Sequence, residues 1–382
     1  MRVMILGGDG YLGWPTAMNL SAYGHDVLVV DNYLRRNLMK SQNVIPLYPV
    51  PELDERTALW NTDHDNRITF ALGDLNEWDF IAGLFRDFEP ETIVHYAEQP
   101  SAPFSMLNRE SAMLTLQNNI SVTANLIFAV WEFAPQAHIV KLGTMGEYGT
   151  PDIDIEEGWL DVEHNGRHQK FLYPRQAGSL YHTTKVMDTD LLWYYTRMWD
   201  LSVTDLMQGP VYGIFTDEAT SDERLLTFLS YDEIFGTVLN RFIVQAVAGI
   251  PLTVYGKGGQ TRGYLNIKDT LNCIRLSVEN PADAGELRIF NQFTETFSVN
   301  DLAAKVSGAA GSLGLDVTVN NLPNPRKEME EHYYNPKNTG LLELGLEPHF
   351  LTEDVLVEML EKVIQHKAEI NKDVIHPATS WT

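Results

Sequence analysis

The sequence predicts an α/β protein built on a doubly wound parallel sheet, with helices on both faces of the sheet and a smaller mixed α/β lobe beside it. Short apolar segments alternate with longer helical patterns up to about residue 207, which is the order that such a sheet needs. A glycine-rich loop directly follows the first apolar segment, at Gly7 to Gly13. We therefore expect a first domain over residues 1–207 and a lobe over residues 208–382, with a segment at about 240–275 packing back on the first domain.

Apolar segments with strand-like composition mark the sheet, and two long segments mark its clearest helices. The expected strands are Arg2–Leu6, Asp26–Val30, Ile68–Ala71, Thr92–Tyr96, His138–Leu142 and Val203–Met207. The expected helices are Ala112–Phe133 and Leu180–Trp199, the second with Leu191, Leu192, Tyr195 and Met198 in the core or in a subunit contact. From residue 208 onward Gly and Pro interrupt the order, which favours a ligand-binding lobe.

The glycine loop predicts a Rossmann-type dinucleotide site. Gly7, Gly10 and Gly13 have the spacing that allows a tight turn, a close backbone approach to a pyrophosphate, and close packing of the next helix. The second strand ends at Asp31, 18 residues after Gly13, where a carboxylate binds both hydroxyls of an adenosine ribose. Because that carboxylate repels a 2′-phosphate, NAD is favoured over NADP, although Arg35 and Arg36 weaken the preference. The alternative is an ordinary turn followed by a solvated Asp31.

Tyr181 and Lys185 stand four residues apart on the second long helix and therefore share one of its faces. An ammonium near the phenol lowers the tyrosine pKa from about 10 toward neutral pH, which makes Tyr181 a usable general base. Thr144 follows a central strand 37 residues earlier, where its hydroxyl can bond the same substrate oxygen. These residues form a candidate triad for nicotinamide chemistry on a hydroxyl group.

The composition narrows the class of partner and the compartment. A formal charge of -24 argues against nucleic acid or an anionic membrane as a partner. Cys273 is the single cysteine, so an internal disulfide and a thiolate metal cluster are excluded, and the histidines show no metal-ligand spacing. No apolar run approaches the roughly 20 residues that span a bilayer, and the first strand begins at Arg2, so we expect a cytoplasmic protein.

Long sequence strings make a resemblance specific. They are Gly-Gly-Asp-Gly-Tyr-Leu-Gly-Trp at 7–14, Lys-Leu-Gly-Thr-Met-Gly-Glu-Tyr-Gly-Thr-Pro at 141–151, His-Asn-Gly-Arg at 164–167, Tyr-His-Thr-Thr-Lys at 181–185, Tyr-Gly-Lys-Gly-Gly-Gln-Thr-Arg-Gly-Tyr-Leu at 255–265 and Glu-Glu-His-Tyr-Tyr-Asn at 330–335. Almost from end to end, the chain resembles the extended short-chain dehydrogenases/reductases that act on nucleotide sugars, and within them the UDP-sulfoquinovose synthases.

This resemblance implies a reaction in which UDP-glucose and sulfite become UDP-sulfoquinovose and water while bound NAD is reduced and then reoxidised. The cofactor-binding residues are then expected to be Gly7, Gly10, Tyr11, Leu12, Gly13, Asp31, Asn32, Arg35, Asp74, Leu75, Asn118, Asn119, Tyr181 and Lys185. Oxidation at C4 of the sugar acidifies the C5 hydrogen, so water is lost to a 4-keto-5,6-ene. Sulfite then adds at C6, and hydride returns to C4.

Elimination and addition need an acid and a base beyond the triad. In nucleotide-sugar 4,6-dehydratases Asp-Glu follows the threonine, whereas this chain has Met145 and Gly146 there and its nearest carboxylate at Glu147. By resemblance Met145, Glu147 and His182 shape the chemistry at C5 and C6, with His182 or Glu147 as the proton carrier. Alternatively, His182 only packs on the cofactor and Glu147 only makes structural hydrogen bonds.

The resemblance also implies a set of substrate-binding residues in the lobe and beside it. They are Gln99, Thr144, Gln208, Thr237, Asn240, Arg241, Tyr255, Gln260, Arg262 and Arg326. Arginine suits a diphosphate because its planar fork binds two oxygens at once. For any one of these arginines alone, a surface salt bridge is the alternative. Pro100 stands where plant relatives are expected to carry an arginine near the substrate, so either the sulfur donor differs or another cation such as Arg109 or Arg167 compensates for it.

The sequence leaves two alternative functions open and also predicts an oligomeric state. A UDP-sugar 4-epimerase or dehydratase would share the triad, but Met145 and Gly146 lack the dehydratase carboxylates. A catalytically silent binding protein is the other rival, and the complete triad speaks against it. The two long helices resemble those that pair across a twofold axis, so we expect at least a homodimer, with the large apolar surfaces of Trp131, Trp193, Tyr194 and Trp199 suited to the interface.

Overall fold

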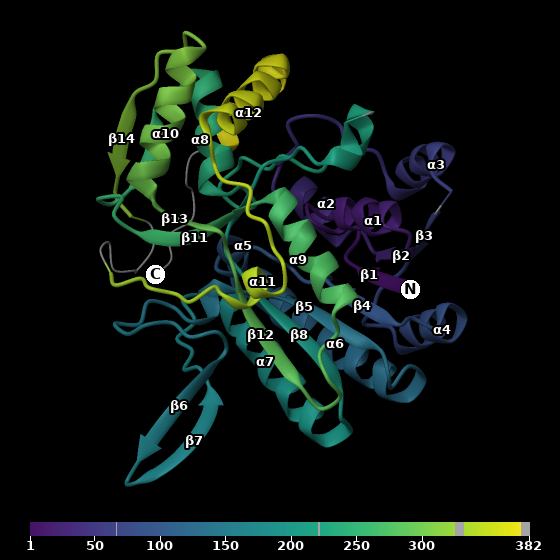
Figure 1. Ribbon diagram of the computed structural model, residues 1–382. Coiled ribbons are helices and arrows are strands. Elements are labelled where there is room, and N and C mark those ends of the chain that lie inside the picture. Colours follow the sequence, from purple (N-terminus) through teal and green to yellow (C-terminus); the bar gives the residue numbers. More distant parts are fainter. Residues whose placement is uncertain (66, 221, 325–331, 376–382) are drawn as a thin grey trace.

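A seven-stranded parallel sheet forms the centre of the molecule (Figure 1). The computed structural model describes residues 1–65, 67–220, 222–324 and 332–375. The strand order is β12-β8-β5-β4-β1-β2-β3, and every neighbouring pair is parallel. The strands are β1 (Arg2–Leu6), β2 (Asp26–Asp31), β3 (Ile68–Leu72), β4 (Thr92–His95), β5 (His138–Thr144), β8 (Ser202–Gln208) and β12 (Leu287–Gln292).

Helices cover both faces of this sheet, as the doubly wound pattern requires. They are α1 (Gly13–Ala22) and α9 (Ile267–Glu279) on one face, and α4 (Trp78–Phe88), α6 (Arg109–Phe133) and α7 (Leu180–Trp199) on the other. Side chains of β1 alternate between the two layers: Val3 and Ile5 lie in one core with Trp14 of α1, whereas Met4 and Leu6 lie in the other. Since successive side chains of a strand point to opposite faces, the sheet is buried on both sides.

Polar caps begin the two long helices of the second layer. The side chain of Asn108 accepts a hydrogen bond from the backbone N–H of Ser111 at the start of α6. The hydroxyl of Ser179 does the same for His182 at the start of α7, at 3.1 Å. Such caps satisfy backbone donors that have no partner inside a helix. They fix where α7 begins, and with it the position of Tyr181 on its first turn.

The second lobe is a helical layer with small sheets beside it. Its helices α8 (Val238–Ala248), α10 (Val299–Ser312) and α12 (Glu353–Gln365) pack on one another. Its strands are β9 (Val211–Tyr212), β11 (Thr261–Asn266) and β13 (Glu295–Ser298) in one sheet, and β10 (Leu252–Tyr255) and β14 (Val319–Leu322) in another. A separate hairpin of β6 (Trp159–His164) and β7 (Arg167–Leu172) projects from the body (Figure 1).

Shorter helices complete the connections between these elements. They are α2 (Leu34–Ser41), α3 (Leu53–Asp63), α5 (Ala102–Ser105) and α11 (Gly340–Glu343), together with single 3₁₀ turns at Met145–Glu147, Asp217–Ala219, Glu223–Leu225, Lys367–Glu369 and Lys372–Val374. The six strands and two long helices expected from the sequence are confirmed, each with bounds that differ by at most three residues. The hairpin of β6 and β7 was not expected.

The chain crosses the expected boundary at residue 207 more than once. Helix α9 returns to the first layer beside α1, and β12 adds the edge strand next to β8. Of the segment 240–275 that we expected to pack back, the part in α9 does so, whereas α8 packs on α10 and α12 in the lobe. Strand β12 lies beyond that segment. The parallel sheet is therefore completed by residues of the second half of the chain.

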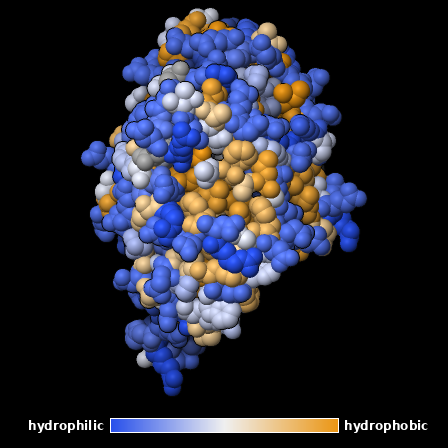
Figure 2. Space-filling model, turned by 90° about the vertical axis from the view of Figure 1, so that its right-hand side faces the viewer, coloured by the Kyte–Doolittle hydropathy of each residue, from blue (hydrophilic) through white to orange (hydrophobic). Residues whose placement is uncertain are grey.

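Part of the surface is apolar. Figure 2 shows hydrophobic side chains gathered in a broad patch near the middle of one face of the molecule. On α6 and α7, large side chains are exposed at Phe128, Trp131, Tyr194 and Met198. Trp193 is instead partly covered, because its ring lies 4.9 Å from that of Trp159 in the hairpin. Among the described residues, no helix is both long and apolar enough to cross a membrane.

Candidate active site

One large cavity lies at the carboxyl ends of the parallel strands. Its volume is about 960 Å³, and residues at or just after the ends of β1, β2, β4, β5 and β8 line it, among them Gly7, Asp31, Tyr96, Thr144 and Gln208. Residues of the second lobe close the other side. In open α/β sheets this edge is where ligands bind, and the volume is at the upper end of the range typical of small-molecule sites.

The glycine loop at one end of the cavity admits no side chain at two of its positions. Gly7 has a φ of +82°, and a Cβ there would lie 2.7 Å from the backbone carbon of Tyr96. A Cβ on Gly13 would lie 2.2 Å from the carbonyl oxygen of Gly7. The loop therefore needs glycine both for its conformation and for the close packing of α1. This backbone cradle at the amino end of a helix fits a pyrophosphate.

Asp9 within the loop is a buried carboxylate held by two arginines. The guanidinium of Arg36 binds it through two nitrogens, at 2.6 and 2.8 Å, and Arg56 pairs with it from the opposite side. Arg56 is fully buried and also stacks over Trp14, with 4.7 Å between its guanidinium carbon and the ring centre. Two cations thus surround this anion beside the loop, so its charge does not oppose the binding of a negatively charged group.

Asp31 lines the cavity at the end of β2, where the sequence predicts the adenosine ribose. One of its oxygens accepts the backbone N–H of Asp9 at 2.9 Å, and the other accepts that of Tyr33 at 2.7 Å. Burial, helped by the charge of Asp9, raises the pKa of Asp31 to about 6. Arg35 and Arg36 were both expected to weaken the preference for NAD. Arg36 forms an ion pair with Asp9 and does not line the cavity, whereas Arg35 does.

Other residues expected at the cofactor fall into two groups. Those that line the cavity are Gly10, Tyr11, Leu12, Asn32, Arg35, Asp74, Leu75 and Asn118. Asn119 does not: it is fully buried, its oxygen accepts the backbone N–H of Gln99 at 2.8 Å, and its amide donates to the hydroxyl of Thr184 at 3.0 Å. The expected cofactor contact of Asn119 is therefore wrong, because its side chain ties the loop after β4 to α7.

The candidate triad comes together at the middle of the cavity. Thr144 ends β5, and Tyr181 and Lys185 lie on the first turns of α7, with the Lys185 Nζ 6.0 Å from the centre of the Tyr181 ring. Thr144 and Tyr181 line the cavity, whereas the ammonium of Lys185 lies behind them. It donates to the carbonyl oxygen of Leu142 at 2.7 Å and pairs with Glu98 at 2.6 Å.

The expected lowering of the tyrosine pKa by Lys185 is wrong for this arrangement. Burial raises the pKa of Tyr181, and the carboxylate of Glu98 raises it further. The physical reason is that the lysine charge is matched by Glu98 at short range, so little of it acts on the phenol. Tyr181 must lose its own proton before it can accept that of a substrate hydroxyl, so the general base of the reaction is its phenolate.

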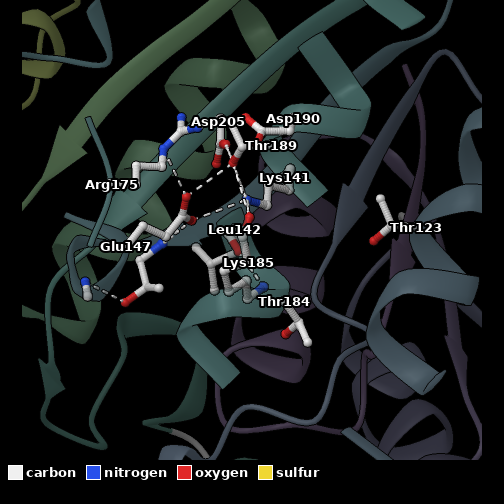
Figure 3. Close-up of polar contacts among 12 residues, drawn as sticks. Thr123, Lys141, Leu142, Glu147, Arg175, Thr184, Lys185, Thr189, Asp190 and Asp205 are labelled. Atoms are coloured by element: carbon white, nitrogen blue, oxygen red, sulfur yellow. Dashed lines mark hydrogen bonds and ion pairs between the residues drawn. The ribbon is translucent and has the colours of Figure 1, made fainter. Parts of the chain in front are cut away.

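Glu147 lies in a buried charge cluster and not on the cavity wall (Figure 3). Its carboxylate is 3.4 Å from Nζ of Lys141 and 3.5 Å from Nε of Arg175, and it accepts the backbone N–H of Thr144 at 3.3 Å. Lys141 also pairs with Asp205 at 3.2 Å. This geometry argues against Glu147 as the proton carrier at C5 and C6, because two cations and the backbone of β5 hold it away from the cavity.

His182 and Met145 both line the cavity beside Thr144. The imidazole lies over Gly146 so closely that a Cβ on that glycine would be 2.4 Å from Nε2 of His182. Its other ring nitrogen, Nδ1, is 3.0 Å from the hydroxyl of Ser179. The imidazole thus occupies the place that a side chain at position 146 would take, which explains why this chain carries no carboxylate there.

The substrate half of the cavity presents polar atoms without partners. All the expected lobe residues in the described part of the chain line it, namely Thr237, Asn240, Arg241, Tyr255, Gln260 and Arg262. Four buried atoms among them have no hydrogen-bond partner in the described residues: Thr237 Oγ1, Asn240 Oδ1, Arg241 Nε and Gln260 Oε1. Because buried polar atoms are normally paired, this set fits a polar ligand. Arg326 lies outside the described residues.

Two glutamines expected at the substrate also line the cavity but are already engaged. The amide of Gln208 donates to the hydroxyl of Thr270 at 2.5 Å, and that of Gln99 donates to the hydroxyl of Thr115 at 2.8 Å. Neither Arg109 nor Arg167 lines the cavity, so neither compensates there for Pro100. The arginines on the described part of the cavity wall are Arg35, Arg241 and Arg262.

Several cavity residues were not expected from the sequence. They are Glu98, Ser101, Gln176, Ser230, Phe235 and Tyr334, among others. Glu98 carried a usable signal, because a carboxylate three residues after the end of β4 lies at the same sheet edge as Thr144. The others come from irregular segments, for which no periodic pattern predicts a position.

Comparisons with known proteins agree with this geometry. The family model for the NAD dependent epimerase/dehydratase family matches residues 3–291. The chloroplastic UDP-sulfoquinovose synthase of Spinacia oleracea is 50% identical over 380 residues, which cover 100% of this chain and 79% of that protein. The UDP-sulfoquinovose synthase of Sulfolobus acidocaldarius is 44% identical over 385 residues, covering 100% of this chain and 98% of that protein.

A solved structure shows the same fold at low identity. The crystal structure of UDP-glucose 4-epimerase from Thermotoga maritima superposes with a TM-score of 0.70 at 20% identity, covering 96% of this chain and 99% of that one. The seven-stranded doubly wound fold is therefore that of nucleotide-sugar epimerases, whereas the full-length identities concern a narrower group. By those identities, and by the dinucleotide cradle and triad that share one cavity, this chain belongs to the NAD dependent epimerase/dehydratase family and, within it, to the UDP-sulfoquinovose synthases.

Proposed function

We propose that this enzyme converts UDP-glucose and sulfite to UDP-sulfoquinovose and water at the cavity described above. Identity of 44 to 50% over the whole chain with two UDP-sulfoquinovose synthases carries this proposal. The residues of the cavity support it, since a dinucleotide cradle, a triad and a set of unpartnered polar atoms follow one another along its wall. The glycine loop and Asp31 would hold NAD, which would supply the acceptor and donor of the hydride exchanged at C4 of the sugar.

Tyr181 handles the proton of the sugar's 4-hydroxyl in this proposal. Its phenol and the hydroxyl of Thr144 line the same part of the cavity, so both can bond one substrate oxygen. Tyr181 takes the proton as the C4 ketone forms and gives it back when the ketone is reduced. Lys185 lies beside the phenol, with its Nζ 6.0 Å from the ring centre, and because it is paired with Glu98 only part of its charge acts on the transient phenolate.

His182 is the acid or base that we assign to C5 and C6. It lines the cavity beside Met145, and its Nδ1 is held by the hydroxyl of Ser179 at 3.0 Å, so the ring has a defined orientation. Glu147 acts on this chemistry indirectly, because its carboxylate accepts the backbone N–H of Thr144 at 3.3 Å and so holds the end of β5. Met145 contributes an apolar wall at the place where a dehydratase has a carboxylate.

The second lobe binds the UDP part of the substrate. Asn240 and Gln260 line the cavity and each has a buried oxygen without a partner among the described residues, and Arg241 adds such a nitrogen on a cation. An arginine binds diphosphate oxygens with charge-assisted hydrogen bonds, which are about twice as strong as neutral ones. The same arginine lies over the ring of Tyr255, with 5.0 Å between its guanidinium carbon and the ring centre, which fixes its plane.

We further propose that the enzyme is a homodimer paired through α6 and α7, and that it works in the cytoplasm. The two helices pack on each other and leave Phe128, Trp131, Tyr194 and Met198 exposed, which is an unusual amount of apolar surface for a monomer. A mass measured by light scattering at micromolar concentration tests the dimer. Imaging of the tagged protein in its native cell tests the compartment.

The decisive experiment for the function is one incubation followed by mass spectrometry. The purified enzyme with UDP-glucose and sulfite is expected to yield UDP-sulfoquinovose, and UDP-glucose alone is expected to yield no UDP-galactose. Formation of UDP-galactose without sulfite would identify a 4-epimerase. Absence of any NADH signal on adding UDP-glucose would identify a silent binding protein.

A further inference from the structure

A buried carboxylate, Glu98, lies against the lysine of the triad. It stands three residues after the end of β4, lines the cavity, and has a side chain that is 2% exposed. One of its oxygens is 2.6 Å from Nζ of Lys185. The lysine side chain is itself only 4% exposed, so the two charges meet out of contact with bulk water. A pair of this kind is strongly coupled, because water screens it little.

The surroundings leave Lys185 as the nearest cation to Glu98. His95 lies 3.6 Å from the same carboxylate oxygen, but burial lowers the pKa of His95 to about 4, so its ring is neutral at neutral pH. That ring also contacts the hydroxyl of Thr123 at 3.1 Å. Lys141 acts on Glu98 from further away. The other oxygen of Glu98 has neither an ion-pair nor a hydrogen-bond partner among the described residues.

Two groups together fix the ammonium of Lys185. The carbonyl oxygen of Leu142 accepts from it at 2.7 Å, in the position that Figure 3 shows, and Glu98 pairs with it at 2.6 Å. A lysine has four rotatable bonds, so a single contact would leave its end mobile. With Leu142 on β5 and Glu98 after β4, the nitrogen is held between two neighbouring strands of the sheet and beside Tyr181.

We propose that Glu98 is a positioning residue of this reaction, which holds the ammonium of Lys185 beside Tyr181 and offsets its positive charge. The inference rests on the proposed role of Tyr181 as the base. The charge of Glu98 matters for the return step, because the proton that Tyr181 takes from the sugar must go back to the same oxygen when C4 is reduced. A tyrosine beside an uncompensated ammonium would release its proton too readily to complete the cycle.

The charges that act on Tyr181 come from four neighbouring elements. Burial raises the pKa of the phenol and Glu98 raises it further, Lys141 on β5 lowers it, and Glu147 and Asp188 raise it. Asp188, three residues after Lys185, has its own pKa raised by burial and by Glu98, and among the groups named it affects the pKa of Tyr181 least. Glu98 is therefore the carboxylate whose removal should change the proton affinity of Tyr181 most.

The test is the pH dependence of hydride transfer in Glu98→Gln, which keeps the shape of the side chain and removes its charge. The holoenzyme is mixed with UDP-glucose without sulfite, and NADH is followed in a single turnover over the widest pH range in which the protein stays folded, extending to alkaline pH because the pKa of Tyr181 is raised. Because Glu98 raises the pKa of Tyr181, its loss should move the acidic limb of the rate profile to lower pH by about one unit. An unmoved limb, or a shift to higher pH, overturns the inference.

Three further variants serve as controls for Glu98→Gln. Glu98→Asp keeps the charge but shortens its reach, so the limb should stay in place while the rate falls by about tenfold to a hundredfold; a wild-type rate contradicts positioning even if Glu98→Gln does not fold. Asp188→Asn should move the limb less than Glu98→Gln does, because Asp188 affects the pKa of Tyr181 less than Glu98 does, and an equal shift also contradicts the inference. Tyr181→Phe is run in parallel, since hydride transfer that persists there refutes the proposed base and not Glu98 alone.

Discussion

The cofactor half and the substrate half of the cavity are built in opposite ways. In the cofactor half, both carboxylates already have partners: Asp31 accepts two backbone N–H groups, and Asp9 is paired with two arginines, whereas Nε of Arg35 has none among the described residues. In the substrate half, buried atoms of Asn240, Arg241 and Gln260 have no partner among the described residues. Carboxylates that are paired within the protein keep their positions before any ligand arrives. A half with unpaired atoms is completed by the ligand.

The difference has an energetic consequence. Leaving a buried polar group unpaired costs about 1 to 3 kcal/mol, so each unpaired atom of the substrate half lowers the stability of the protein until a ligand pairs with it. This cost does not arise at Gly7 and Gly13 of the glycine loop, because these positions have no side chain that could be left unpaired. We therefore expect the nucleotide sugar to change the dynamics of the second lobe more than NAD changes those of the first domain.

The largest effect is expected where the two halves meet. Tyr181→Phe removes the group that exchanges a proton with the substrate, and general acid–base catalysis contributes about 10² to 10⁴ in rate. Because neither half is altered, NAD should stay bound through purification and UDP-glucose should still bind. Single-turnover NADH formation measures the rate, and calorimetry measures binding. Near-normal turnover would remove Tyr181 from the chemistry.

A large effect is also expected from Gly146→Ala. Its Cβ would lie 2.4 Å from Nε2 of His182, so the imidazole must move, and a displacement of about 1 Å at a reacting group costs about 10² in rate. Oxidation at C4 should continue, so NADH should form while the sulfonated product does not. Gly308→Ala, where the added Cβ meets nothing within 4 Å, is the control for the substitution itself. Equal product yields in both variants would contradict the role given to His182.

An intermediate effect is expected at the substrate half. Arg241→Gln removes a charged hydrogen-bond donor worth about 1.5 to 3 kcal/mol, so the KM for UDP-glucose should rise by about tenfold or more. Retention of NAD should not change, since Arg241 belongs to the other half. Arg275→Gln, which removes an ion pair with Glu279 and a contact with the ring of Tyr23 away from the cavity, should leave the KM as it is. A loss of NAD in Arg241→Gln would show that the halves are not independent.

The smallest effect is expected from pH at the cofactor half. The pKa of Asp31 is raised to about 6, so below that pH the carboxylate gains a proton and loses an acceptor for the ribose hydroxyls. The Kd for NAD should therefore increase a few-fold as the pH falls through about 6. The same group raises its proton affinity on folding, so its contribution to stability is present at low pH and is lost as the pH rises through about 6. Asp31→Asn should abolish both dependences, which titration calorimetry and thermal unfolding can follow.

The cofactor half could be predicted from the sequence because its residues are close together in the chain. Gly7, Gly13 and Asp31 lie in one strand-loop-helix-strand unit, whose local geometry follows from spacing. The triad could be predicted for a similar reason, since Tyr181 and Lys185 share a helix face. Asn119 was misplaced because adjacent residues on a helix point in different directions, and only the packing of α6 against α7 decides which of the two amides meets the cavity.

By itself, the sequence determined the doubly wound sheet, the dinucleotide loop and the chemistry of the triad, because each depends on short-range spacing and on periodicity. Only the tertiary structure decided that β12 completes the sheet, that Glu147 is buried between Lys141 and Arg175, and that Glu98 pairs with Lys185. The physical reason is that these outcomes depend on which distant segments share a low-dielectric interior. In that interior a buried charge is stabilised only by a partner that the fold has placed next to it.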